Sequence, residues 1–185
     1  MTVMAELVTR KLIKAVGVSN FNAQKMENSW ETLQKSGIPL ASNQVRYNLL
    51  DRRIESNGVM NLAIKLGITI IAYSPLAQGL LTGKFHDNPE LLKNIGFRKY
   101  SPPFKSEGLE KSRPVVNLVK ELAIKYNVTT SQVALNWLIQ YNGDTVVAIA
   151  GATKEIHVKE NCGAMSFRLS DEDMLRLDKV SLIFK

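Results

Sequence analysis

The chain has 185 residues, of which 45% are hydrophobic and 22% are charged. This is an ordinary globular composition, and the length suits one hydrophobic core rather than two. The formal net charge is +7, but Lys and Arg are spread along the whole chain with no basic run and no basic-aromatic stripe, so composition argues against nucleic-acid binding.

Helical and strand-like patterns alternate over the first part of the chain. Asn22 is placed to cap a helix, while Gly37 and Gly67 are placed to end two helices. The spacing of apolar residues predicts helices at residues 3–12, 22–37 and 54–66, and short buried strands at residues 14–20, 41–47 and 68–73. The strand centres are evenly spaced, as expected for repeated strand–helix units.

The second part of the chain begins with a long segment, residues 74–111, that is rich in Gly, Pro and Lys and is expected to be irregular and functional. We expect Pro114 at the first position of a helix that ends at Tyr126, and Thr130 as the cap of a helix over residues 131–141. The remaining pattern predicts a strand at residues 145–150, a helix at residues 155–162, and a last helix that is capped by Ser170 with Asp173 and ends at Val180.

Parallel strands joined by helices define the α/β class, and the even spacing favours a barrel over an open sheet. A complete TIM-type (β/α)₈ barrel needs about 250 residues, whereas this chain shows four strands. We therefore predict a partial barrel with about four parallel strands. Half a barrel has two sheet edges that another surface must cover, and we expect them near Ala15 and Val147.

Several kinds of site and location are disfavoured by simple counts. The longest apolar stretch, residues 68–73, is far shorter than the roughly 20 residues that span a bilayer, and no signal peptide or membrane anchor is evident. The single cysteine, Cys162, cannot form an internal disulfide, and with His86 and His157 it is insufficient for a structural zinc site. We expect a cytoplasmic protein without a metal site, and Cys162 as a small core residue.

Polar side chains stand at the end of each predicted strand, where α/β proteins bind ligands. The residues are Ser19 and Asn20, Gln44, Tyr73 and Ser74, and the run from Gly151 to Lys154. Taken singly, each could be an ordinary turn or cap residue. An interior glutamine on an apolar strand needs a hydrogen-bond partner, so Gln44 favours a binding site when all the strand ends are considered together.

Four motifs occur in order along the chain: Gly17–Phe21, Asn43-Gln44 with Tyr47-Asn48, Ala72–Leu76, and Gly151–Lys154 with Glu160-Asn161. In sequence and spacing they resemble the successive signatures of the aldo-keto reductases. The resemblance covers the chain from Met1 to about Val180. It implies that residues 1–185 are a single unit, the C-terminal half of an aldo-keto reductase barrel.

The same resemblance implies a set of NADPH-binding residues. Ser19, Asn20 and Gln44 would hydrogen-bond the nicotinamide carboxamide, and Tyr73 would stack on the nicotinamide ring, roles that suit amide and aromatic groups. The pyrophosphate would be wrapped by Ser74, Pro75, Leu76, Ala77 and Gln78, with Lys84 and Arg98 adding positive charge.

The last motif is implied to bind the adenosine end of the cofactor. Gly151 opens this motif, Thr153, Lys154 and His157 would surround the 2′-phosphate, and Glu160 and Asn161 would hold the adenine. Because these groups suit a 2′-phosphate, the resemblance implies NADPH rather than NADH as the cofactor. This chain departs from the family pattern at His157, where many family members carry Gln or Arg.

The resemblance further implies NADPH-dependent reduction of aldehydes and ketones by the full-length parent, with a small-molecule carbonyl compound as substrate. The family's catalytic tyrosine, lysine, aspartate and histidine lie on its first four strands, and no residue of this chain matches them. We therefore assign no catalytic residue and expect the chain alone to be inactive. Two interpretations stay open: a fragment of a reductase, or a non-catalytic NADPH-binding or regulatory module that closes its barrel by self-association through its strand edges.

Overall fold

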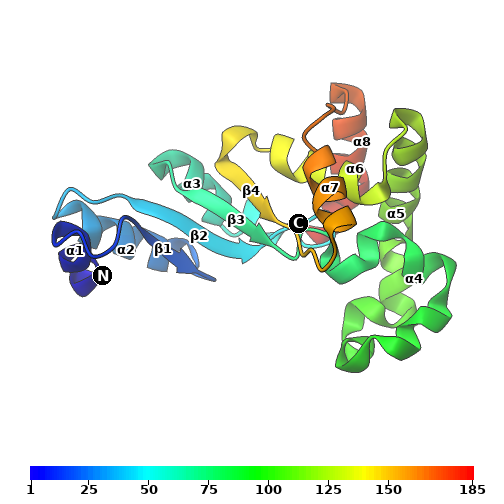
Figure 1. The fold of residues 1–185 in the computed structure, drawn as a ribbon, viewed down its shortest axis with the longest axis horizontal. Coiled ribbons are helices and arrows are strands. Elements are labelled where there is room, and N and C mark those ends of the chain that lie inside the picture. The colour runs from blue at the N-terminus through cyan, green and yellow to red at the C-terminus, as the bar shows by residue number, and fades with distance from the viewer.

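A computed structural model describes residues 1–185 and shows one sheet of four parallel strands in the order β1-β2-β3-β4 (Figure 1). The strands are β1 (Val16–Ser19), β2 (Leu40–Arg46), β3 (Thr69–Tyr73) and β4 (Val146–Ile149). Each lies within a few residues of its predicted position, which confirms the α/β class and the four parallel strands. Each new strand adds beside the previous one, as in a (β/α) barrel.

The helices gather in two groups: α1 to α3 lie along the N-terminal part of the sheet, and α4 to α8 lie toward its other end (Figure 1). Their bounds are α1 (Thr2–Thr9), α2 (Ala23–Gln34), α3 (Val59–Leu66), α4 (Lys84–Asp87), α5 (Ser106–Tyr126), α6 (Thr130–Gln140), α7 (Glu155–Gly163) and α8 (Asp171–Ser181). Two predicted caps are confirmed. Asn22 Oδ1 accepts from the Lys25 amide at 2.9 Å, and Ser170 Oγ accepts from the Asp173 amide at 3.2 Å. No helix combines the length and the apolar character that crossing a membrane requires.

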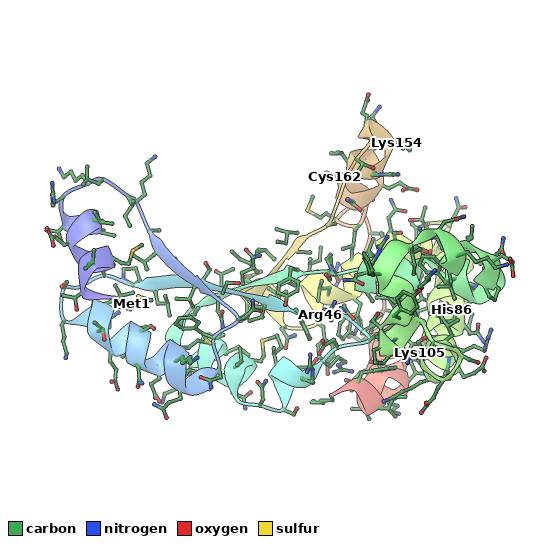
Figure 2. All side chains as sticks on the ribbon, turned by 90° about the horizontal axis from the view of Figure 1, so that it is seen from below. Met1, Arg46, His86, Lys105, Lys154 and Cys162 are labelled. Carbon is green, nitrogen blue, oxygen red and sulfur yellow. The ribbon has the colours of Figure 1, made fainter.

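The hydrophobic core covers only one face of the sheet. Along β2, Asn43 and Val45 are buried, whereas Gln44 and Arg46 are only half-buried, because alternate side chains of a strand point to opposite faces. Figure 2 shows α2 and α3 together on one side of the strands. The second face is therefore open, and both outer strands, β1 and β4, have a free edge as predicted.

The segment predicted to be irregular, residues 74–111, contains more regular structure than expected. Short 3₁₀ turns and α4 follow one another, and α5 begins at Ser106. A small second core of Leu80, Phe85, Phe104 and Leu109 holds the segment together. The burial of these apolar side chains compensates for a sequence with weak local periodicity.

The predicted start of the helix at Pro114 is wrong, because α5 begins eight residues earlier and Pro114 lies inside it. A proline inside a helix costs one backbone hydrogen bond. On the upstream turns, Leu109 and Ser112 are buried against the rest of the protein. Tertiary packing therefore extends the helix past the proline.

Two further corrections concern single residues. The cap of α6 is Thr129 rather than Thr130, because Gln132 lies three residues after Thr129 and the two exchange the reciprocal hydrogen bonds of a capping box. Thr130 instead donates to the carbonyl of Thr82 at 3.2 Å. Cys162 is exposed rather than part of the core, because α7 buries none of its residues.

A buried ion-pair network joins α8 to the loop after β2. The Arg52 guanidinium is fully buried and donates to both carboxylate oxygens of Glu55 at 2.8 and 2.7 Å, and to Asp178 Oδ1 at 2.6 Å. It also lies 5.1 Å from the Trp137 ring centroid and 5.0 Å from that of Tyr141. The network ties together segments that lie far apart in the sequence.

Two kinds of buried or half-buried group, carboxylates and a histidine, make the stability depend on pH. Burial by itself raises the pKa of Glu55 and of Asp178, but their hydrogen-bond donors, Arg52 among them, outweigh it and hold both pKa values below their ordinary range. Burial, reinforced by nearby cations, lowers the pKa of His86. In each case the unfolded chain takes up its proton at a higher pH than the folded chain, so acid favours unfolding.

We expect the free energy of unfolding to fall in two stages as the pH is lowered. The first begins below the ordinary histidine value of 6.5, and the second below the ordinary carboxylate values of 4.5 and 3.8. Urea unfolding followed by tryptophan fluorescence at a series of pH values measures both. The variant His86→Gln should lose only the first stage, and constant stability of the unchanged protein from neutral to strongly acidic pH would contradict the expectation.

Candidate functional site

The ends of β1, β2 and β3 meet in one hydrogen-bonded group. The backbone amide of Asn20 and the hydroxyl of Ser19 both donate to the carbonyl of Gln44, at 2.9 and 3.0 Å. The hydroxyl of Tyr73 donates to Asn20 Oδ1 at 3.1 Å. The structure thus brings together the four residues predicted for the nicotinamide end. Gln44 is half-buried on the open face, and its side-chain amide is left to a ligand or to solvent.

The backbone is strained at the ends of β1 and β3. Four of the six non-glycine residues with positive φ lie there: Asn20 at 58°, Ser74 at 51°, Ala77 at 48° and Gln78 at 55°. Such conformations cost of the order of 1–3 kcal/mol each and cluster at ligand-binding sites. The strain therefore marks the same segments as the sequence motifs.

Asn48 holds the loop after β3 in place, a role that sequence reasoning did not assign. Its side chain is buried; Nδ2 donates to the carbonyl of Ser74 at 3.0 Å, and Oδ1 accepts from the amide of Leu50 at 2.8 Å. The signal available in the sequence was an amide side chain directly after an apolar strand, which must find partners if it is buried.

A cavity of about 470 Å³ lies between the loop after β3 and the segment that joins β4 to α7. Nine of the residues that line it were predicted to bind cofactor: Ser74, Pro75, Leu76, Gln78, Lys84, Gly151, His157, Glu160 and Asn161. Thr82 and Ser131 also line the cavity and were not predicted. Two motifs that are distant in sequence therefore form one concave surface, as a binding site requires.

Lys84 is an exposed cation beside the strained loop. Its ammonium group lies 4.9 Å from the centroid of the Phe85 ring. The side chain also passes close to Gly79: a Cβ added to that glycine would lie 3.4 Å from Lys84 Cε. No carboxylate pairs with Lys84, so its positive charge is available to an anion in the cavity.

The beginning of α7 combines hydroxyl, imidazole and ammonium groups. Thr153 and Lys154 are exposed and lie just outside the lining of the cavity. The amide of Thr153 donates to Nδ1 of His157 at 3.4 Å, and His157 does line the cavity. As predicted, α7 begins at Glu155, so its first free amides add to a site that suits an anionic group such as a phosphate.

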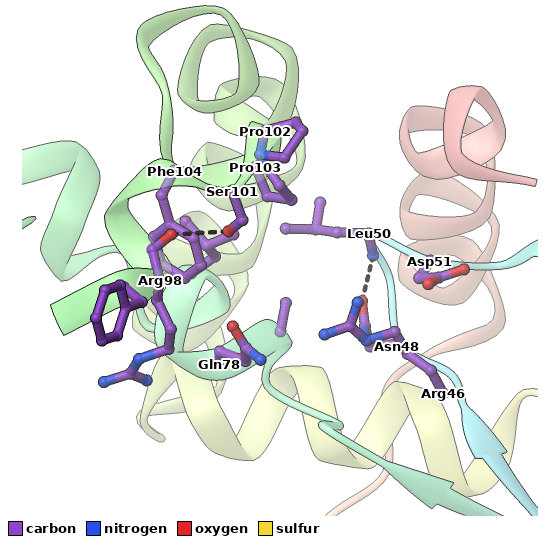
Figure 3. Close-up of a pocket in the computed structure, with 13 residues that line it drawn as sticks. Arg46, Asn48, Leu50, Asp51, Gln78, Arg98, Ser101, Pro102, Pro103 and Phe104 are labelled. Atoms are coloured by element: carbon purple, nitrogen blue, oxygen red, sulfur yellow. Dashed lines mark hydrogen bonds between the residues drawn. The ribbon is translucent and has the colours of Figure 1, made fainter. Parts of the chain in front are cut away.

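Arg98 lies apart from Lys84, in a neighbouring cavity of about 480 Å³ that it shares with Ala77 and Gln78 (Figure 3). Its side chain is exposed, and its Nε donates to the carbonyl of Ile95 at 3.3 Å. Gln78 lines both cavities, whereas Lys84 lines only the first and Arg98 only the second.

Parallel strands that follow one another in order and are joined by helices are typical of the class of (β/α)-barrel proteins, in which ligands bind at the C-terminal ends of the strands. Residues 1–182 match the Aldo/keto reductase family. The chain therefore belongs to that family, as its motifs indicated.

Individual relatives agree with this assignment. The chain is 34% identical over 177 residues to a protein named chloroplastic pyridoxal reductase from Arabidopsis thaliana, covering 95% of this chain and 46% of that protein. It is 32% identical over 180 residues to the aldo-keto reductase str7 of Strobilurus tenacellus, with coverage of 96% and 52%. The chain thus spans about half the length of the curated relatives it matches.

A solved structure supports the fold. The crystal structure of the thermostable aldo-keto reductase Tm1743, in complex with the inhibitor epalrestat, aligns with a TM-score of 0.71 and 32% sequence identity. The alignment covers 97% of this chain and 53% of that one. The open sheet of four strands is therefore related to a TIM-type barrel and corresponds to about half of one.

Proposed function

We propose that residues 1–185 form the NADPH-binding half of an aldo/keto reductase barrel, and that the whole protein is an oxidoreductase that reduces aldehydes or ketones. The observation that carries this proposal is the cavity of about 470 Å³, where the loop after β3 faces the beginning of α7. The strained loop and Lys84 line this cavity and suit the pyrophosphate. The amides of Asn20 and Gln44, at the strand ends, and Thr153 and Lys154, before α7, lie outside its lining and suit the two ends of the cofactor.

The residues at the nicotinamide end are proposed to orient the nicotinamide ring. Ser19, Asn20 and Gln44 would hydrogen-bond the carboxamide, which needs both donors and acceptors. The Tyr73 hydroxyl already donates to Asn20 Oδ1 at 3.1 Å, and its aromatic ring would stack on one face of the nicotinamide ring. When bound, NADPH supplies the hydride that reduces a carbonyl carbon, and Tyr73 would leave only one face of the nicotinamide open to the substrate.

The loop after β3 and the beginning of α7 are proposed to recognise the phosphates and the adenine of the cofactor. Ser74 to Gln78 would bind the pyrophosphate through their backbone, with Lys84 as the neutralising cation. The 2′-phosphate would be bound by Thr153, Lys154 and His157, beside Gly151, and the adenine by Glu160 and Asn161. A charged 2′-phosphate contact of this kind selects NADPH over NADH, because NADH lacks that phosphate.

Reduction also needs an acid, positioned to protonate the alkoxide that develops on the substrate. We propose that no residue of this chain takes that role, because none matches the family's catalytic positions. The substrate of the whole protein is proposed to be a small carbonyl compound. Pyridoxal belongs in any panel of candidates, since one relative is named for its reduction.

The proposal is tested by titrating the purified chain with NADPH and with NADH while following the quenching of its tyrosine and tryptophan fluorescence. We expect micromolar binding of NADPH and about a hundredfold weaker binding of NADH, because NADH would lose both the Thr153 and the Lys154 contact at about tenfold each. No binding of either nucleotide would refute the cofactor role. Oxidation of NADPH above background with a panel of aldehydes would refute the proposed lack of a catalytic acid.

A second candidate function is a non-catalytic module that closes its barrel with another copy. It is favoured by the free edge of β4, where Val147 and Ile149 are 46% and 47% exposed beside an apolar cavity of about 560 Å³. An exposed apolar edge is unfavourable in water unless another surface covers it. Light scattering on the titration sample decides: a defined dimer supports this function, while a monomer or a polydisperse sample contradicts it.

A further inference from the structure

We propose that Arg46 and Arg98 form a site for an anionic group, a carboxylate or a phosphate, on the carbonyl substrate. The sequence motifs assign no role to Arg46, and the family resemblance implies only a cofactor role for Arg98. The inference rests on the proposed function, because it assumes that the nicotinamide lies near Tyr73.

The position of Arg46 follows from the sheet. It ends β2 and lies two residues after Gln44, so both side chains are on the open face. Its register partner on β3 is Tyr73, and paired residues of neighbouring parallel strands point to the same side. Arg46 therefore stands next to the residue proposed to cover the nicotinamide.

Arg46 also connects two cavities. It lines the one of about 270 Å³ that holds Asn20 and Tyr73, and the one of about 480 Å³ that holds Arg98. In Figure 3, the Arg46 side chain extends from the end of β2 toward Gln78, and Arg98 lies beyond Gln78 on the opposite wall. A molecule in the larger cavity could thus reach both the arginine pair and the proposed nicotinamide end.

The hydrogen-bonding capacity of Arg46 is unused. Its Nε is buried and has no hydrogen-bond partner, and no carboxylate pairs with its guanidinium. A buried donor without a partner is unfavourable in a folded protein. An anionic oxygen in the cavity would satisfy it, and the planar guanidinium is suited to a carboxylate or a phosphate.

The remaining charges leave the larger cavity positive. Arg98 uses Nε on the Ile95 carbonyl and forms no salt bridge. The one carboxylate in the lining belongs to Asp51, and both its oxygens accept from Arg53 at 2.8 and 2.7 Å. Asp51 therefore does not neutralise Arg46 or Arg98.

The rest of the lining suits a small organic molecule. Leu50, Phe97 and Phe104 add apolar surface, and the volume is within the range of small-molecule sites. The cofactor phosphates are proposed to lie in the other cavity, of about 470 Å³, whose lining includes Lys84 and His157. Arg46 and Arg98 are therefore available to bind the substrate. Their two guanidinium groups favour a carbonyl compound that carries a carboxylate or a phosphate.

The test compares two ketones of the same shape, 4-acetylbenzoate and its neutral amide 4-acetylbenzamide, by calorimetric titration of the chain at low salt. We expect the charged probe to bind about tenfold tighter, as one charge-assisted contact provides. The variant Arg46→Met should lose this preference while its affinity for the neutral amide stays unchanged. The control Arg10→Met, which removes an exposed arginine directly after α1, should keep the preference.

Equal affinity for the two probes, or binding of neither, would overturn the inference. It is also overturned if Arg46→Met weakens NADPH binding and leaves the probe preference intact, because Arg46 would then belong to the cofactor phosphates. An NADPH titration of the unchanged chain separates the two proposals: NADPH binding without a preference for the charged probe refutes only the arginine site, and the reverse result refutes only the cofactor role.

Discussion

Replacing Arg52 with methionine is expected to lower the free energy of unfolding by about 3–5 kcal/mol, the usual cost of removing one partner from a buried ion pair. The guanidinium is fully buried and bridges Glu55 and Asp178. Without it, two carboxylates would stay close together and largely shielded from water. The packing of α8 against the loop after β2 would lose its main polar contact.

Urea unfolding, followed by the fluorescence of Trp137 beside Arg52, measures this loss. The matched control is Arg53→Met, the next residue along, whose side chain is 72% exposed and pairs with Asp51. An exposed pair of this kind contributes about 0–1 kcal/mol. Similar losses in the two variants would show that the buried network does not stabilise the fold beyond an ordinary surface pair.

The double variant Thr153→Val with Lys154→Met is expected to weaken NADPH binding about a hundredfold, because two charge-assisted contacts at about tenfold each would be lost. NADH binding should stay unchanged, since NADH has no 2′-phosphate. Both side chains are exposed at the beginning of α7, so the variant should fold normally. Fluorescence titration with the two nucleotides gives both affinities on one sample.

The control for this variant is Lys159→Met, an exposed lysine on the same helix that pairs with Glu155. It changes the net charge by the same amount as Lys154→Met, and it should leave both nucleotide affinities unaltered. An equal loss of NADPH affinity in control and double variant would mean that only long-range charge acts here, and that α7 makes no direct contact with the 2′-phosphate.

Much of the candidate site was predictable because its residues follow strands that the local sequence defines. In parallel sheets, the C-terminal ends of the strands converge, so Asn20 and Tyr73 could be expected together before their hydrogen bond was seen. Arg46 could not be predicted as a site residue, because no local sequence pattern marks it. An arginine at the end of a strand is ordinarily solvated, and only the structure shows that Arg46 lines two cavities and has an unpartnered Nε.

The sequence by itself determined the strand–helix order, the parallel sheet and the family motifs, since these depend on periodicity and on contacts between near neighbours. The cap at Asn22 is such a local contact. Tertiary structure alone decided that α5 passes through Pro114, that Cys162 is exposed and that Arg52 is buried. For α5 and Arg52 the deciding partners are far away along the chain, and packing against them outweighs local propensity. Cys162 is exposed because α7 buries none of its residues against such partners.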